Sequence, residues 1–223
     1  REVSKAGLGM AYEIDSDERI SLNDAALLNS PTVTGEITIL AWINASANVS
    51  TNPSQGFGIV TKQNTTHRDY MLFLNNATST MAFSMRNNSG TFFQLTGNTK
   101  INSNLSWYHV AVTYNKTTTN TTLYINGAVD KSVNSTVPNL LVDSTSSLTI
   151  GGGSANNFFP GLIDDVAIYN RTLNSSEVLD IYRLKEGVYY LRVNVTDAAG
   201  GANSTNSSPI YTFYIDATGP NVT

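Results

Sequence analysis

The sequence predicts an all-β protein: a sandwich of two β-sheets with one short helix near its end, followed by a two-stranded extension. Segments that alternate apolar and polar residues recur with about 10–12 residues between their starts, which is typical of an antiparallel sandwich. Asn, Thr, Ser and Gly fill the turns between these segments. The chain has 223 residues, of which 40% are hydrophobic, and no apolar run approaches membrane-spanning length. One core of ordinary size is therefore expected.

The predicted elements follow one another with short turns. An edge strand or lead-in is expected within residues 1–10, a strand–turn–strand unit at 11–22 and a loop at 23–35. Further strands are expected at residues 36–46, 56–63, 68–75, 80–87, 91–97, 105–115 and 146–154. Residues 121–132 are expected to form a hairpin on Asn126-Gly127, because both residue types tolerate the positive φ of a two-residue turn.

Residues 161–182 are predicted to be a closing strand and a helix. Strict alternation across 161–170 puts the neighbouring carboxylates Asp164 and Asp165 on opposite faces. The face of Asp165 is expected to carry Ile163, Asp165, Ala167 and Tyr169. Asn174 precedes Glu177 by three positions, which is the spacing of a helix-capping box, and an apolar stripe follows. A short helix should begin there and dock on a sheet.

These segments, in this order, resemble the laminin-G-like, concanavalin-A-like jelly-roll family over about residues 8–184. The resemblance rests on the I-x-x-W motif through Trp42 in the strand at 36–46, on LSWYHVAVTYN at 105–115, on the L-Y-x-N-G hairpin, on L-x-I-G-G, and on G-x-I-D-D-V-x-I-Y-N. It implies a jelly-roll domain, taken as residues 1–185, and a structural role for His109. Ser16 stands where the family has glycine after Asp15.

Residues 186–223 are predicted to form a separate unit. Two alternating segments, near 187–196 and 210–216, resemble the last two strands of bacterial and archaeal immunoglobulin-like surface repeats. Two strands alone are marginally stable in water. Either they belong to the next repeat of a longer protein, or they complete a sheet in a neighbouring copy.

Polar uncharged residues dominate the surface composition. Charged residues make up 13%, about half the usual share, and the net charge is −4 without a basic cluster, which argues against nucleic acid and membrane-surface binding. With 26 Asn and 50 Ser plus Thr, chance would give about six N-x-S/T acceptor patterns, and the sequence has 15. A densely N-glycosylated extracellular or cell-surface protein is expected. The predicted acceptors are Asn44, Asn48, Asn64, Asn76, Asn87, Asn104, Asn115, Asn120, Asn134, Asn170, Asn174, Asn194, Asn203, Asn206 and Asn221.

Catalysis is not predicted. Related jelly-roll glucanases carry E-x-D-x-x-E on one strand, and this sequence has no such stretch. It also has no cysteine, no G-x-S-x-G and no phosphate-binding loop. His109 is expected to be packed, and His67 lies in a polar loop.

Calcium is the one cofactor that the resemblance supports. Family members often bind it between the first acidic turn and the Asp of the closing strand, and calcium prefers oxygen ligands. Carried over, this nominates Asp15 and Asp165, with Asp17 and Asp164 as further candidates. The alternative, that these acids cap turns and solvate the surface, remains open.

Two functions follow as hypotheses. The first is a structural subunit of a glycosylated surface fibre or layer, assembled head to tail with other copies through the C-terminal strands. The alternative is a calcium-dependent carbohydrate- or protein-binding adhesin module, which an exposed aromatic platform would favour. Among the aromatics, Phe158 and Phe159 lie in a loop and are candidates for ligand contact or for buried anchors. Core packing is expected for Trp42, Trp107, Tyr108 and Tyr114.

Overall fold

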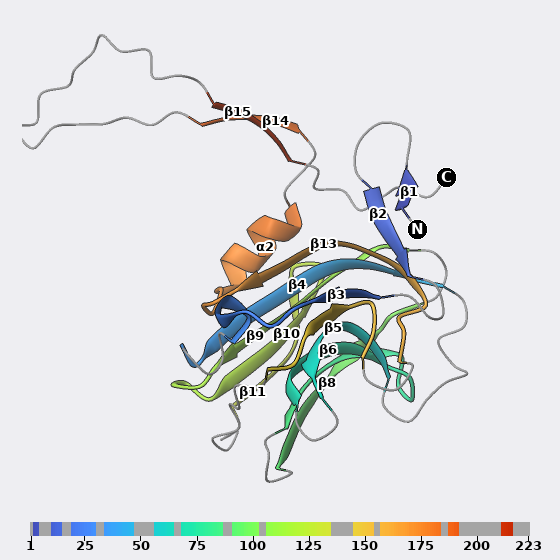
Figure 1. Ribbon diagram of the computed structural model, residues 1–223. Helices are drawn as coiled ribbons and strands as arrows, with labels where there is room; N and C mark the ends of the chain where they lie inside the picture. Colours follow the sequence, from blue (N-terminus) through green and yellow to red (C-terminus); the bar gives the residue numbers. More distant parts are fainter. Residues whose placement is uncertain are drawn as a thin grey trace, which may run out of the picture.

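In the residues that it describes, the structure is a sandwich of two large antiparallel β-sheets with one α-helix on the outside, together with a further pair of strands (Figure 1). This computed structural model describes residues 2–4, 10–14, 19–29, 34–46, 56–64, 68–86, 91–102, 106–134, 145–153, 157–183, 187–191 and 211–215. The two large sheets and the helix after the last sandwich strand confirm the predicted fold class.

The first sheet has seven strands in the order β1-β2-β13-β4-β9-β10-β11. They are β1 (Glu2–Ser4), β2 (Met10–Ile14), β4 (Glu36–Ala45), β9 (Tyr108–Asn115), β10 (Asn120–Ile125), β11 (Ala128–Asn134) and β13 (Gly161–Tyr169). The central strand β4 pairs with β9 and β13, which come much later in the chain. The sheet is therefore built mainly from long-range pairings.

The second sheet has six strands in the order β3-β12-β5-β6-β7-β8. They are β3 (Ile20–Leu22), β5 (Phe57–Gln63), β6 (Arg68–Asn75), β7 (Thr80–Arg86), β8 (Phe92–Lys100) and β12 (Leu148–Ile150). A short 3-10 helix, η1 (Ala26–Asn29), lies in the predicted loop. The edges of the two sheets meet where the Asp130 carboxylate of β11 accepts hydrogen bonds from the backbone N–H groups of Asn98 (2.8 Å) and Thr99 (2.9 Å) of β8.

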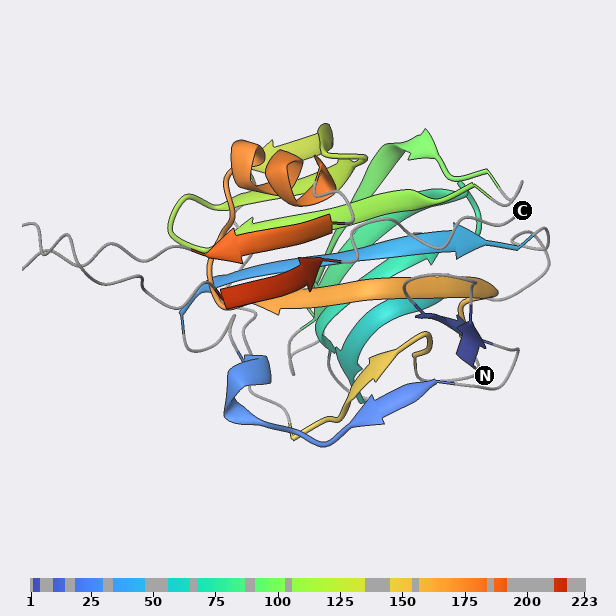
Figure 2. The same cartoon turned by 90° about the horizontal axis from the view of Figure 1, so that it is seen from above.

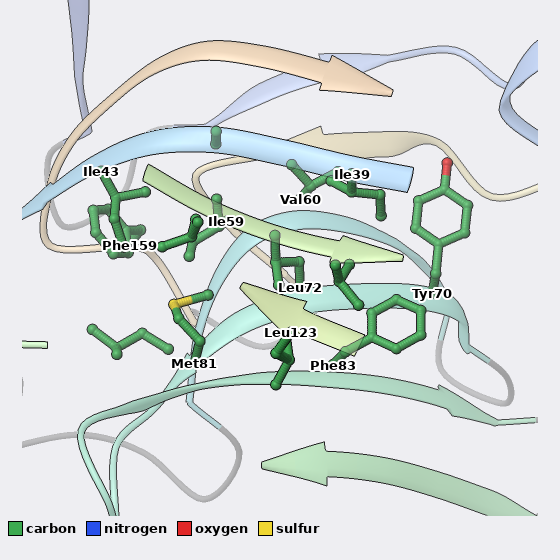
Figure 3. Packing of buried hydrophobic residues seen from close by; sticks show 14 of the residues in the cluster. Ile39, Ile43, Ile59, Val60, Tyr70, Leu72, Met81, Phe83, Leu123 and Phe159 are labelled. Carbon is green, nitrogen blue, oxygen red and sulfur yellow. The ribbon is translucent and has the colours of Figure 1, made fainter. Parts of the chain in front are cut away.

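The core lies between the sheets, because every second residue of each strand points inward. Figure 3 shows Ile39 and Ile43 of β4 facing Leu72 and Phe83 of the six-stranded sheet. At one end of the sandwich the buried Nζ of Lys62 lies 3.0 Å from carboxylate oxygens of both Asp24 and Asp69. A buried lysine is tolerated there because its charge is paired.

Helix α2 (Ser175–Arg183) begins where the capping box predicts. The N–H of Glu177 donates to Asn174 Oδ1 (3.0 Å), and the N–H of Asn174 donates to Glu177 Oε2 (2.8 Å). Val178 packs against Leu40 and Tyr124 on the outer face of the seven-stranded sheet. Figure 2 shows the orange helix over the yellow-green strands β10 and β11.

The strict alternation predicted for residues 161–170 is wrong at one point. Asp165 has a φ of 46°, and the pairing of β13 with β4 shifts between Asp164 and Ala167. The extra residue of this β-bulge reverses the alternation that follows. The residues turned toward the core are therefore Ile163, Val166 and Ile168.

Two shorter elements also agree with the sequence. The β10–β11 hairpin turns on Asn126 (φ 51°) and Gly127 (φ 75°), as predicted. Strands β14 (Gly187–Leu191) and β15 (Tyr211–Ile215) pair with each other, and in the described part of the chain they pair with neither large sheet. Their assignment to an immunoglobulin-like unit stays a prediction.

Candidate ligand-binding face

The outer face of the six-stranded sheet carries polar and charged side chains beside a small apolar patch. The strand register places Met71, Phe73 and Ala82 on this face, where they form a buried cluster apart from the main core. Further along β6 and β7, the same face carries Arg68, Ser84 and Arg86. The outer face thus changes from apolar at Met71, Phe73 and Ala82 to polar and charged at Arg68, Ser84 and Arg86.

We call Gln63, Arg68, Ser84, Arg86 and Phe92 the arginine face, because two arginines lie at its centre. Arg68 and Arg86 are directly paired across β6 and β7, and Arg86 is paired with Phe92 of β8. The guanidinium of Arg68 donates from Nε to Gln63 Oε1 and from Nη1 to Ser84 Oγ, both at 2.7 Å. These contacts fix its orientation.

Irregular pairing brings Arg68 to this face. In a regular strand Arg68 would point the same way as Tyr70, whose side chain is in the core. The pairing of β6 with β7 shifts between Arg68 and Met71, and the pairing of β5 with β6 shifts between Lys62 and Gln63. Sequence reasoning missed the arginine face because alternation alone predicts the wrong side for its central residue.

The arginine face is electropositive and partly apolar. Burial, and then the nearby charge of Arg86, lower the pKa of Arg68 to about 10. Like charges directly opposite on neighbouring strands are unfavourable. The Arg68 Cζ lies 5.9 Å from the ring centroid of Phe92, and that ring is 51% exposed. Two guanidinium groups beside an accessible ring can bind an anionic group and an apolar surface together.

The aromatics singled out from the sequence are not on this face. Phe159 is fully buried in the core and acts as a loop anchor, whereas Phe158 is half-buried. Trp42 lies under α2, with its ring centroid 5.4 Å from that of His109 and 5.8 Å from that of Tyr182. Phe92, by contrast, is 51% exposed.

His109 is packed, as the sequence predicts. Its side chain is fully buried, and burial lowers the pKa of its imidazole to about 4. Within the described part of the chain neither ring nitrogen has a hydrogen-bond partner. The ring is therefore neutral at physiological pH and contributes packing. His67 lies outside the described residues.

Of the four predicted calcium ligands, the structure describes Asp164 and Asp165. Asp15 and Asp17 lie outside the described residues. Asp164 is half-buried, accepts the N–H of Asp165 at 2.8 Å, and has its pKa raised by burial. Ile14, next to Asp15, pairs with Gly161, and three residues of strand, about 10 Å, separate Gly161 from Asp164. The described residues contain no cluster of three potential metal ligands, and because Asp15 and Asp17 are not among them, the calcium site stays a prediction.

Eight of the 15 predicted glycosylation acceptors are described. Asn64, Asn134, Asn170 and Asn174 are exposed, and Asn76, Asn115 and Asn120 are partly exposed. Asn44, by contrast, is 1% exposed within β4, where a glycan has no room. The remaining seven lie outside the described residues: Asn48, Asn87, Asn104, Asn194, Asn203, Asn206 and Asn221.

The sandwich, its strand order and its docked helix define the class of the protein. The chain belongs to the concanavalin A-like lectin/glucanases superfamily, whose laminin-G-type family model matches residues 15–179. No curated protein matches the chain. No helix in the described segments is long and apolar enough to cross a membrane.

Solved structures show the same fold at low sequence identity. The binding domain of Paraclostridial Mosquitocidal Protein 1 is 20% identical with a TM-score of 0.66, over 85% of this chain and 50% of that one. The binding domain of botulinum neurotoxin DC, solved in complex with SialylT, is 15% identical with a TM-score of 0.62, over 82% and 44%. A heptameric SAP-like pentraxin from Limulus polyphemus is 12% identical with a TM-score of 0.50, over 66% and 69%. The chain thus spans about half the length of the two toxin domains.

Proposed function

We propose that this protein is a non-catalytic, N-glycosylated extracellular module that binds acidic carbohydrate through the arginine face. The observation that carries the proposal is the pairing of Arg68 with Arg86 beside the half-exposed ring of Phe92. Related folds are described as binding domains, one of them in complex with SialylT, which supports a binding role for this one.

The chemistry of the face indicates the ligand class. A guanidinium presents paired N–H donors that match a carboxylate or a sulfate, and an aromatic ring stacks on the apolar face of a sugar. Because the two positive charges oppose each other across the strands, an anion placed between them relieves their repulsion. Uronic acids, sialic acids and sulfated sugars meet these requirements, whereas neutral sugars use only the ring.

The experiment measures binding of the glycosylated chain to an array of neutral, sialylated, sulfated and uronic-acid-containing oligosaccharides. We expect acidic glycans to be bound and neutral ones to be bound at least ten times more weakly. Arg86→Ala and Phe92→Ala should each weaken binding about tenfold or more, since each removes one part of the face. Raising the salt concentration should weaken the acidic-glycan signal, because the charge interaction is partly exposed.

Val129→Ala is the matched control, because Val129 is 53% exposed on a strand of the other sheet. It should leave binding unchanged. Equal binding of neutral and acidic glycans, or wild-type binding by Arg86→Ala, would refute the arginine face as the site.

Repeating the array with calcium and with EDTA tests the calcium dependence predicted from Asp15, Asp17, Asp164 and Asp165. Binding that survives EDTA would remove calcium from the proposal.

A second candidate function is the structural subunit of a glycosylated surface fibre or layer, joined head to tail. Two observations favour it: the 15 acceptor patterns in the sequence, and the β14–β15 pair that joins neither large sheet in the described residues. The two functions are compatible, since a fibre subunit can also bind glycans.

A further inference from the structure

Three predicted glycan acceptors lie in one row across three neighbouring strands. Asn115 at the end of β9 pairs with Asn120 at the start of β10, and Asn120 pairs with Asn134 at the end of β11. Directly paired residues point to the same side of a sheet. Since Tyr114 and Val133 contact the core, the row of acceptors faces outward.

The row is too closely spaced to hold three glycans. Paired residues on neighbouring antiparallel strands lie about 5 Å apart. An N-glycan is bulky, and its first sugar is attached to the side-chain amide nitrogen, Nδ2. Neighbouring glycans at this spacing would overlap, so the three asparagines cannot be equivalent in the folded protein.

The hydrogen bonds distinguish them. Asn115 Nδ2 donates to Glu36 Oε1 at 2.8 Å, while its Oδ1 accepts the N–H of Thr118. Asn120 Nδ2 donates both to Asn134 Oδ1 (2.7 Å) and to Ser132 Oγ (3.2 Å), which uses both of its hydrogens. In both residues the atom that would carry the glycan is therefore part of a hydrogen-bond network that joins the ends of neighbouring strands.

Asn134 and Asn174 differ, because their side chains make these hydrogen bonds through Oδ1 and not through Nδ2. Asn134 accepts through Oδ1, is exposed, and lies on β11, the last strand of its sheet. Asn174 is exposed as well, and its Oδ1 accepts from both Glu177 N–H and Ser176 Oγ. Because the cap uses only Oδ1, a glycan on Nδ2 leaves the helix cap intact, and Asn174 can be a cap and a glycan acceptor together.

From this geometry we infer that Asn134 and Asn174 carry N-glycans in the folded protein, whereas Asn115 and Asn120 are unmodified and join the ends of neighbouring strands through their amide groups. The inference rests on the glycosylated surface proposed above, but not on the ligand. A chain modified at Asn120 would lose at least one of two donor contacts, and the sugar would displace the Asn134 side chain.

Mass spectrometry of the full chain, purified from its native source or secreted by an N-glycosylating host, tests the assignment. Enzymatic removal of glycans in ¹⁸O-water marks each occupied asparagine, and trypsin separates Asn120, between Lys116 and Lys131, from the other acceptors. We expect occupancy at Asn134 and Asn174 to exceed that at Asn115 and Asn120 at least tenfold.

Two variants give an independent readout by intact mass. Thr136→Ala removes the Asn134 acceptor pattern and should reduce the mass by one glycan. Thr117→Ala removes the Asn115 pattern at an exposed turn position and should leave the glycan mass unchanged. Occupancy of Asn115 or Asn120 equal to that of Asn134 overturns the inference while leaving the glycosylated surface standing; a chain without glycans at any site overturns both.

Discussion

At the scale of single residues, His109 illustrates how burial alone sets a chemical property. Desolvation of the imidazolium is the cause that lowers its pKa to about 4, and no charged group among the described residues contributes to the shift. The unfolded chain titrates near the ordinary value of about 6.5. Between these two values the unfolded state binds a proton that the folded state does not, so the free energy of unfolding falls as the pH falls.

We therefore predict that the protein loses stability as the pH is lowered from about 6.5 toward 4, and that His109→Phe reduces this loss. The pKa difference between the two states corresponds to about 3 kcal/mol over the full interval. Urea unfolding at several pH values between 7.5 and 4.5 measures it. His67→Gln is the control and should follow the wild type. If His109→Phe shows the same pH dependence as the wild type, burial does not govern this histidine.

Side-chain contacts between residues close in sequence could be predicted from the sequence. Side-chain orientations that depend on strand pairing could not. The Asn174–Glu177 capping box involves residues three apart, so spacing alone predicted its geometry. The orientation of Asp165 and of Arg68 depends on bulges, where one strand gains a residue against its partner. Nothing in the local alternation marks where such a residue is gained.

At the scale of elements, Gly127 couples the β10–β11 hairpin to α2. Its φ of 75° is in the left-handed region, and a Cβ there would lie 2.8 Å from side-chain carbons of Leu179 and Tyr182 on the helix. We predict that Gly127→Ala destabilises the protein by about 2–4 kcal/mol: about 1 from the positive φ and the rest from forcing the helix away. Thermal or urea unfolding measures it.

Gly35→Ala separates the two contributions. Gly35 has the same φ of 75°, but its added Cβ would approach only Lys116, whose Cβ would lie 3.3 Å away, so a shift of a few tenths of an ångström relieves the contact. It should cost about 1 kcal/mol. Equal losses for the two variants would mean that the contact between the hairpin turn and the helix contributes little to stability.

At the scale of the whole molecule, the sandwich was predictable because its strands are short and are separated by turn residues. The strand positions from residue 36 onward agree with the predicted segments to within a few residues. The functional surface was not predictable in this way, since Gln63, Arg68, Ser84, Arg86 and Phe92 come from four strands and meet only through sheet pairing. The predicted calcium residues, by contrast, came from the resemblance, and because Asp15 and Asp17 lie outside the described residues, that site stays a prediction.

The last prediction concerns the boundary after residue 185. In the described residues β14 and β15 pair only with each other, so no strand of the sandwich uses their backbone groups as partners. Removing residues 186–223 should leave the sandwich with an unfolding midpoint within about 2 °C of the full chain and an unchanged cooperative transition.

If the C-terminal strands join copies head to tail, the same truncation should abolish self-association. Sedimentation velocity and electron microscopy of the glycosylated full chain and of the glycosylated truncated chain can measure this. A truncated chain that no longer unfolds cooperatively would place these strands inside the domain. Filaments formed equally well by both forms would show that another surface joins the copies, and monomers from both would refute the head-to-tail fibre.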